Sequence, residues 1–223
     1  MKLISLLLIG LFLFTTCKQP QEKEPEPEQK LLKVACIGDQ VMQGQQVDSI
    51  DRYPALLQWL LGENYQVRTF VLRNANVLSN GEQPFLSDTL CQQAKDFQPD
   101  IVVINLGIND TKPKNWLLHG TDFLGDYMNL VETFMILSSR PKVFICRPSK
   151  PFSNTDEVSD STLQASVLPN IDSVSAWRHL QKIDLYAITS DRSDMFIDYI
   201  YPDRTGCRIF AETIADAIIS ESK

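Results

Sequence analysis

The 223-residue sequence is poor in histidine and carries no basic excess. Its two histidines, His119 and His179, leave little material for histidine-based catalysis or metal binding. Lys and Arg total 21 against 28 Asp and Glu, which gives a net charge of −7. We therefore expect no nucleic-acid partner, because the basic residues needed to neutralise phosphates are missing.

The cysteines do not form a metal-binding pattern. The chain has five cysteines but no C-x-x-C pair, and neither histidine stands at zinc-ligand spacing, so we predict no metal site and no cofactor. Cys36 and Cys146 fall within apolar runs typical of strands, where a free thiol packs as a small hydrophobic residue. A disulfide in an exported protein is the alternative.

Long apolar runs are absent except at the N-terminus. Residues 3–14 follow Lys2 and are apolar except for Ser5 and Gly10. This run is shorter than the roughly 20 residues that span a bilayer, but it suits the hydrophobic region of a signal peptide. It leads through two threonines into Cys17, which resembles a lipobox. We predict that residues 1–17 are a lipoprotein signal peptide and that Cys17 is the lipidated N-terminus. A plain secretory peptide is the alternative.

Residues 18–31 are dominated by Glu, Gln, Lys and Pro and contain no aromatic or β-branched residue. Such a segment cannot bury enough apolar surface to offset the entropy lost on ordering, so we predict a disordered tether. An acidic stretch after a lipidated cysteine resembles those that direct lipoproteins to the outer face of some diderm bacteria. We therefore expect the protein in the cell envelope, held to the outer membrane or cell surface by its lipid.

Residues 32–223 alternate between strand-like and helical apolar patterns. Strands separated by helices predict a three-layer α/β/α domain with a central parallel sheet and right-handed crossovers. We expect residues 34–37, 101–106 and 142–146 to be neighbouring buried strands, because they form β-branched apolar runs. The remaining strands are predicted at 65–72 and 182–186, and helices at 53–61, 123–137, 171–180 and 205–220.

Three segments at the ends of predicted strands carry a family resemblance. They read KVACIGDQ at 33–40, LGIND at 106–110 and DYIYPDRTG at 198–206. They resemble the SGNH (GDSL-type) ester hydrolases, which hold Gly-Asp-Ser, Gly-x-Asn-Asp and Asp-x-x-His-Pro at these places. Bacterial members directed at carbohydrate, of the sialate O-acetylesterase-like kind, are particularly similar. The resemblance extends over residues 32–223 and implies the SGNH hydrolase (flavodoxin-like) fold, with its site at the carboxyl ends of the strands.

The resemblance also implies that the catalytic residues have been replaced. Gln40 stands at the position of the nucleophilic serine, Tyr201 at that of the histidine base, and Asn74 at that of a glycine that donates to the oxyanion. Asn109 and Asp198 match the family's asparagine and third triad residue. A glutamine amide is not nucleophilic, and the reference pKa of tyrosine, near 10, is too high for a base at neutral pH. Losing the nucleophile of a serine hydrolase costs on the order of 10⁶ in turnover, so we interpret the chain as non-catalytic.

No other residue restores this chemistry in the sequence. We expect His119 in a loop after the third strand and His179 near a helix end, so neither stands where the family places its base. Asp39 and Asp198 could instead act as a carboxylate pair for acid–base catalysis. That pair is kept as an alternative.

The residues that match the family have structural explanations too. Asn109 and Asp110 follow a strand, where such side chains cap turns through local hydrogen bonds. Asp198 could bond the backbone before the last helix. Gly38 and Gly107 are expected to be required by turn geometry.

The remaining polar residues at these strand ends predict a ligand-binding cleft. Amides, a guanidinium and a phenol suit the hydroxyls or acids of a sugar, and an aromatic ring offers a stacking face. We predict a non-catalytic envelope lipoprotein that binds a glycan or an envelope protein partner. The alternatives are an active esterase on acetylated carbohydrate that uses other residues, and a structural or partner-binding protein with a closed cleft. The ligand-binding candidates are Asp39, Gln40, Arg73, Asn74, Asn109 and Tyr201.

Overall fold

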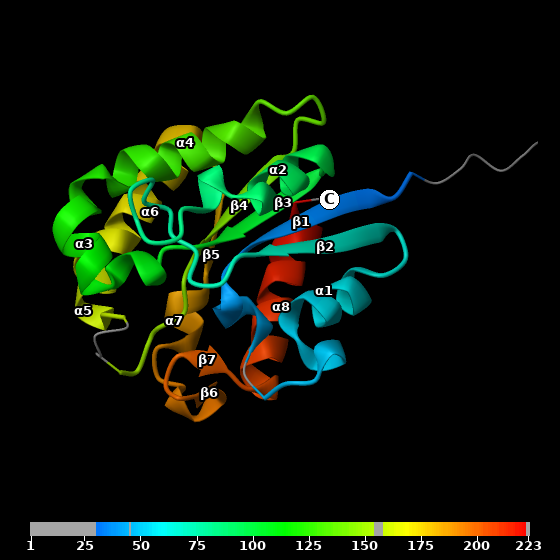
Figure 1. The fold of residues 1–223 in the computed structure, drawn as a ribbon. Helices are drawn as coiled ribbons and strands as arrows, with labels where there is room; N and C mark the ends of the chain where they lie inside the picture. The colour runs from blue at the N-terminus through cyan, green and yellow to red at the C-terminus, as the bar shows by residue number, and fades with distance from the viewer. Residues whose placement is uncertain (1–29, 45, 154–157, 222–223) are drawn as a thin grey trace, which may run out of the picture.

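Five parallel strands form a central sheet in the order β2-β1-β3-β4-β5 (Figure 1). Ile104 of β3 lies opposite Ile37 of β1 and Ile145 of β4, so the three predicted strands are neighbours as expected. A short antiparallel pair, β6 and β7, forms a separate sheet. The strands are β1 (Leu32–Gly38), β2 (Tyr65–Val71), β3 (Ile101–Asn105), β4 (Lys142–Arg147), β5 (Gln181–Asp184), β6 (Phe196–Ile197) and β7 (Tyr201–Pro202).

The structure is a computed structural model that describes residues 30–44, 46–153 and 158–221. The predicted signal peptide, Cys17 and nearly all of the predicted tether lie outside these residues. Within the described ranges, no helix is long and apolar enough to cross a membrane.

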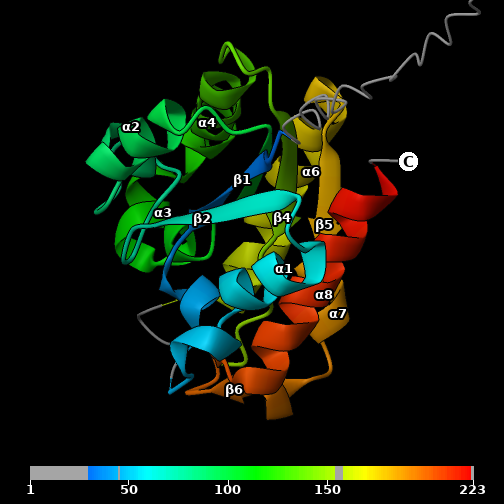
Figure 2. The ribbon, with the colours of Figure 1, turned by 90° about the vertical axis from the view of Figure 1, so that its right-hand side faces the viewer.

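Helices cover both faces of the sheet (Figure 2). Helices α1 and α8 pack on one face, and α2, α4 and α6 pack on the other. The three-layer α/β/α class is therefore confirmed. The helices are α1 (Tyr53–Leu61), α2 (Thr89–Asp96), α3 (Pro113–His119), α4 (Phe123–Met135), α5 (Asp160–Thr162), α6 (Leu168–Arg178), α7 (Leu185–Thr189) and α8 (Arg204–Ser220). Short helical turns are η1 (Gln40–Gln43), η2 (Ser49–Asp51), η3 (Phe85–Ser87), η4 (Asn109–Thr111), η5 (Gly120–Asp122), η6 (Leu163–Val167) and η7 (Ser193–Met195).

Side-chain alternation along β1 builds a core on each face of the sheet. Ala35 and Ile37 join the core beneath α2, α4 and α6, whereas Val34 and Cys36 join the core beneath α1 and α8. Successive side chains of a strand point to opposite faces, so a strand covered on both sides is apolar at every position. Cys36 and Cys146 are free and fully buried, as expected for small core residues.

Two local expectations are wrong. The strand predicted at 182–186 ends at Asp184, whose side chain caps α7 by accepting a 2.9 Å hydrogen bond from the Ala187 N–H. His119, expected in a loop, is the last residue of α3, which begins at Pro113. Proline suits the first turn of a helix, because its missing N–H would have no partner within the helix there.

Candidate functional site

The candidate site lies where the strand order reverses between β1 and β3, which is where open α/β sheets bind ligands. The loops after β1, β2 and β3 and the turn between β6 and β7 surround a cavity of about 360 Å³. Most of the predicted site residues line this cavity. They are Gln40, Arg73, Asn74, Asn109, Asp198 and Tyr201.

Gln40 connects three of these segments through its side-chain amide. Its Oε1 accepts a 2.6 Å hydrogen bond from the Asn74 N–H, and its Nε2 donates to Asn74 Oδ1 at 2.9 Å. The same Nε2 lies 3.3 Å from the Tyr201 hydroxyl oxygen, to which it donates. Gln40, Asn74 and Tyr201, which were predicted to replace three residues of the family, therefore form one hydrogen-bonded cluster.

Asn74 adopts a left-handed backbone conformation with φ 57°. This region disfavours residues with a Cβ, although Asn tolerates it better than most. The bond from its N–H to Gln40 stabilises the conformation, and its Oδ1 also accepts from Lys112 Nζ at 3.4 Å.

Asn109 uses its side chain within the protein. Its Nδ2 donates to the Asp39 carboxylate and, at 3.3 Å, to the Ala75 carbonyl oxygen. Both amide hydrogens are therefore engaged. The family resemblance implied that the Asn109 amide donates to the oxyanion of a reacting ester. Its hydrogen bonds to Asp39 and Ala75 compete with that role.

Asp39 lies beneath the cavity and not in its wall. It is 1% exposed, and its Oδ1 accepts a 2.8 Å hydrogen bond from the Val41 N–H, which caps η1. The prediction that Asp39 contacts ligand and the alternative of an Asp39–Asp198 pair are therefore not supported by the geometry. Burial raises the pKa of Asp39 to about 7, although the Val41 N–H and the Lys112 charge lower it.

The Asp110 side chain forms hydrogen bonds with a loop that is distant in the sequence. Its Oδ1 accepts hydrogen bonds from the Val77 and Leu78 N–H groups at 3.0 and 2.8 Å. Burial raises its pKa to about 7 despite these two donors. The local turn-capping role expected for Asn109 and Asp110 is wrong, because both side chains bond residues more than 30 positions away in the chain.

The last segment departs from expectation in one respect. Asp198 was expected to bond the backbone before the last helix, but Asp203 caps α8 by accepting from the Gly206 N–H at 2.9 Å. Asp198 is exposed in the cavity wall instead. Asp198 and Tyr199 both have positive φ, 51° and 62°, and such strain in an aromatic residue is uncommon.

Two glycines next to the site are required by the geometry of the backbone. Gly107 has φ 125°, and a Cβ at Gly38 would lie 2.9 Å from the Asn105 carbonyl oxygen, so both glycines are required as expected.

His119 ends α3 and His179 is the left-handed C-cap of α6, and neither lines the cavity. Within the described ranges, no cluster of three or more His, Cys, Asp or Glu could hold a metal ion.

Lys112 is the charged lining residue that the sequence interpretation missed. It is 5% exposed and follows η4, two residues after the Asn-Asp pair. The available signal was the closeness of this lysine to a motif at the end of a strand. Residues just past the end of a strand line the same crevice.

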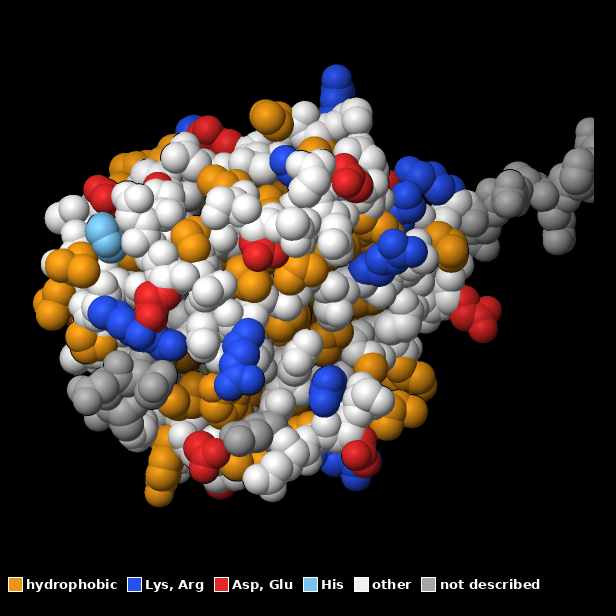
Figure 3. All heavy atoms as spheres, viewed as in Figure 1, with side chains coloured by type: hydrophobic (Ala, Val, Ile, Leu, Met, Phe, Trp, Pro, Cys, Tyr) orange, Lys and Arg blue, Asp and Glu red, His pale blue; other side chains and the backbone are white. Residues whose placement is uncertain are grey.

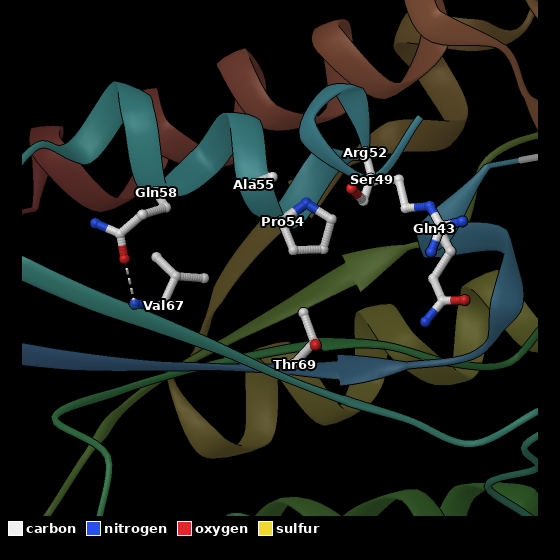
Figure 4. A pocket seen from close by; sticks show the side chains of 8 residues that line it. All are labelled: Gln43, Ser49, Arg52, Pro54, Ala55, Gln58, Val67 and Thr69. Carbon is white, nitrogen blue, oxygen red and sulfur yellow. Dashed lines mark hydrogen bonds between the residues drawn. The ribbon is translucent and has the colours of Figure 1, made fainter. Parts of the chain in front are cut away.

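Two other hollows contain none of the predicted site residues. One, of about 380 Å³, lies between α1 and β2 and includes Gln58 and Val67 (Figure 4). The other, of about 670 Å³, lies between α1 and α8 and includes Trp59. On the face seen in Figure 3, Lys and Arg side chains are interspersed with Asp and Glu and form no single basic patch.

Comparisons with known proteins agree with this fold. No family model matches the chain. The acetylxylan esterase of Xylanibacter ruminicola is 30% identical over 214 residues, which cover 87% of this chain and 44% of that protein. The chain thus spans less than half the length of this curated relative. The chain is thus similar in sequence to part of an acetylxylan esterase, and its resemblance to the SGNH-type ester hydrolases is supported.

Solved structures of SGNH-type esterases share the fold of the whole domain. The M. smegmatis aryl esterase superposes with a TM-score of 0.71 at 17% identity, covering 85% of this chain and 99% of that one. A carbohydrate acetylesterase from Sinorhizobium meliloti gives a TM-score of 0.69 at 15% identity, with the same coverage. The predicted SGNH hydrolase fold is therefore confirmed.

Proposed function

We propose that this protein is a non-catalytic SGNH relative that binds a glycan in the cleft around Gln40. The observation that carries the proposal is the Gln40 amide, which stands at the nucleophile position and is bonded through both its oxygen and its nitrogen. An amide held in this way neither attacks an ester nor accepts a proton from a neighbour at neutral pH. The side chain serves to connect loops and to present hydrogen-bonding groups.

The composition of the cavity wall supports the loss of catalysis. Among the described residues that line it, none is Ser, Thr, Cys or His. Thr111 is nearby in the chain, but its Oγ1 is buried, donates to the Ile108 carbonyl oxygen at 2.6 Å and accepts from the Ser159 N–H. A nucleophile beside a base is what an active esterase with substituted residues would require.

The cavity remains suited to a sugar. It is open rather than filled by bulky side chains, and its wall presents amide, guanidinium and phenol groups. These groups match the hydroxyls of a carbohydrate. The names of the relatives, an acetylxylan esterase and a carbohydrate acetylesterase, support carbohydrate as the ligand class.

The test combines hydrolysis with binding. The purified protein is assayed on p-nitrophenyl acetate and acetylated xylan, and is screened on a glycan array, with Gln40→Ala as the matched variant. We expect no hydrolysis above buffer, and glycan binding that weakens in the variant. Clear turnover that disappears on Asn109→Ala would show an active esterase instead. An inactive protein that binds no glycan would favour a structural or partner-binding role.

We further propose that Cys17 attaches the protein to the cell envelope, with residues 18–31 as a tether. The signal-length apolar run before Cys17 supports this placement. Each buried CH₂ of a lipid contributes about 0.8 kcal/mol and one chain holds weakly, so stable attachment implies several chains. Cys17→Ala should leave the membrane fraction or stay unprocessed, whereas the control Gln19→Ala should not. An Ala variant that fractionates and migrates like wild type contradicts the anchor.

A further inference from the structure

Two cationic side chains line the cleft at different depths. Arg73 is exposed and directly follows the β2 loop residue Leu72, whereas Lys112 is almost fully buried. Asn74 connects them, because it is the chain neighbour of Arg73 and accepts from Lys112 Nζ at 3.4 Å. Two positive charges therefore line the same cavity.

Arg73 differs from most arginines of this chain. The side chains of Arg147, Arg178 and Arg208 are each paired with a carboxylate. Arg68 lies over the Phe97 ring at 4.7 Å. Arg73, in contrast, makes no side-chain hydrogen bond or ion pair with any residue that the structure describes. Its guanidinium is thus available to a ligand, and its planar donors match a carboxylate in a bidentate manner.

The cavity wall also carries a negative group. Asp198 also lines the cavity and is exposed, yet it forms no ion pair with Arg73 in the described structure. Its backbone and that of Tyr199 are held in the left-handed region. The cavity wall therefore carries charges of both signs, with Arg73 and Lys112 as cations and Asp198 as a carboxylate on the turn between β6 and β7.

The charge of the whole chain makes this local arrangement informative. At −7, the protein as a whole does not attract an anion. In the lining of the cleft, the cationic residues that could attract an anionic ligand are Arg73 and Lys112. The hydroxyls of the same ligand would meet the amides and phenol of the Gln40 cluster.

We propose that the cleft recognises an acidic glycan, with a sugar carboxylate on Arg73 and Lys112 and neighbouring hydroxyls on Gln40 and Tyr201. The inference rests on the glycan binding proposed above and adds the chemical class of the sugar. A uronic acid residue within an oligosaccharide has the required combination of one carboxylate and several hydroxyls.

The experiment uses a matched pair of ligands. Binding of a xylo-oligosaccharide that carries glucuronic acid is compared, by calorimetry, with the same oligosaccharide after its carboxyl is reduced to an alcohol. We expect the acid to bind at least about tenfold more tightly, with a preference that shrinks as salt increases. Arg73→Gln should reduce the preference to about twofold while the reduced sugar still binds. Lys112→Gln should weaken binding of the acid.

Lys114→Gln is the control, because Lys114 lies two residues away but is exposed and paired with Glu82. It should retain the preference. Equal binding of the two sugars by wild type overturns the acidic class while glycan binding stands, and binding of neither overturns both. A preference that survives Arg73→Gln overturns the assigned contact. Arg73 is exposed, so this variant carries the test even where Lys112→Gln does not fold.

Discussion

The side-chain oxygen of Gln40 lies 2.6 Å from the backbone nitrogen of Asn74, and the hydrogen bond between them joins the loop after β1 to the loop after β2. The bond satisfies the N–H of a residue held at positive φ. The same glutamine donates back to the Asn74 side chain, so the two residues are bonded reciprocally. Gln40, which was predicted to stand at the nucleophile position, thereby contributes to the shape of the cleft.

Gln40→Ala should lower stability. The variant leaves the Asn74 N–H and the Tyr201 hydroxyl without their partner, and a net hydrogen bond contributes about 1 kcal/mol. We expect the Tm to fall by about 2–4 °C, as measured by thermal unfolding. Gln43→Ala, at the other end of the same short helix η1, is the control and should change the Tm less. Equal decreases in the two variants would contradict the role assigned to Gln40.

Asn74 allows the backbone to be tested separately from the side chain. Both Asn74→Ala and Asn74→Gly remove the contacts to Gln40 and Lys112. Only alanine places a Cβ in the left-handed region, which costs about 1–2 kcal/mol. We therefore expect Asn74→Ala to be less stable than Asn74→Gly by about 1 kcal/mol in urea unfolding. The opposite order would show that φ 57° is not maintained in solution.

Asp39 should make stability fall as the pH rises. Its folded pKa of about 7 exceeds the ordinary value of 3.8, so the folded protein holds a proton that the unfolded chain releases. The contribution of this group to stability is then lost between about pH 4 and pH 7. Relative to wild type, Asp39→Asn should gain stability at pH 7.5 compared with pH 5, as followed by Tm. Asp96→Asn, which removes an exposed carboxylate from α2, is the control variant. Parallel curves for wild type and Asp39→Asn would rule out the raised pKa.

Gln58 protects the free edge of the sheet. From α1, its Oε1 accepts from the Val67 N–H at 2.8 Å (Figure 4). Its Nε2 donates to the Tyr65 carbonyl oxygen at 3.0 Å, so the side chain bonds the strand as a neighbouring strand would. Uncovered edge strands pair with other chains. Gln58→Leu should therefore increase aggregation, measured by light scattering during prolonged incubation at elevated temperature. Gln92→Leu, on exposed α2, should aggregate less, and the reverse ranking would count against this account.

Restoring the family's residues should recover little activity. In the triple variant Gln40→Ser, Asn74→Gly, Tyr201→His, the Asn109 amide still donates to Asp39 and Ala75, and Arg73 still lines the cleft. We expect at most weak hydrolysis of p-nitrophenyl acetate. The same triple variant with Ala at position 40 measures the background. Turnover close to that of an active SGNH esterase assayed alongside would mean that the remaining cleft is already competent.

The strands were predictable where burial is complete on both faces. β1, β3 and β4 are continuous apolar runs, and their order followed from the alternation with helices. Helix α2 was not predicted, because it is short and buries only Cys91 and Ala94. The end of β5 was misplaced, because the Asp184 cap starts α7 within what appears in the sequence as one apolar run.

The residues that line the site were predictable from the order of the motifs, but the hydrogen bonds between them were not. Gln40 and Asn109 were placed by motifs that follow strands, and Tyr201 by a motif before the last helix, whereas the Gln40–Asn74 contact joins residues 34 positions apart. Asp39 was expected to face ligand, but the Val41 N–H and Asn109 hold its carboxylate below the cavity. Such a choice between two directions of one side chain depends on partners that only the folded chain brings together.

Asp110 holds the Val77–Leu78 backbone from a position that no ligand reaches, and Asp39 supports η1 from the same buried layer. Part of the support of the cleft therefore comes from two buried carboxylates that do not line it. Under the proposed binding function, exposed side chains of the lining can change to suit another ligand while these two carboxylates continue to hold the loops in place.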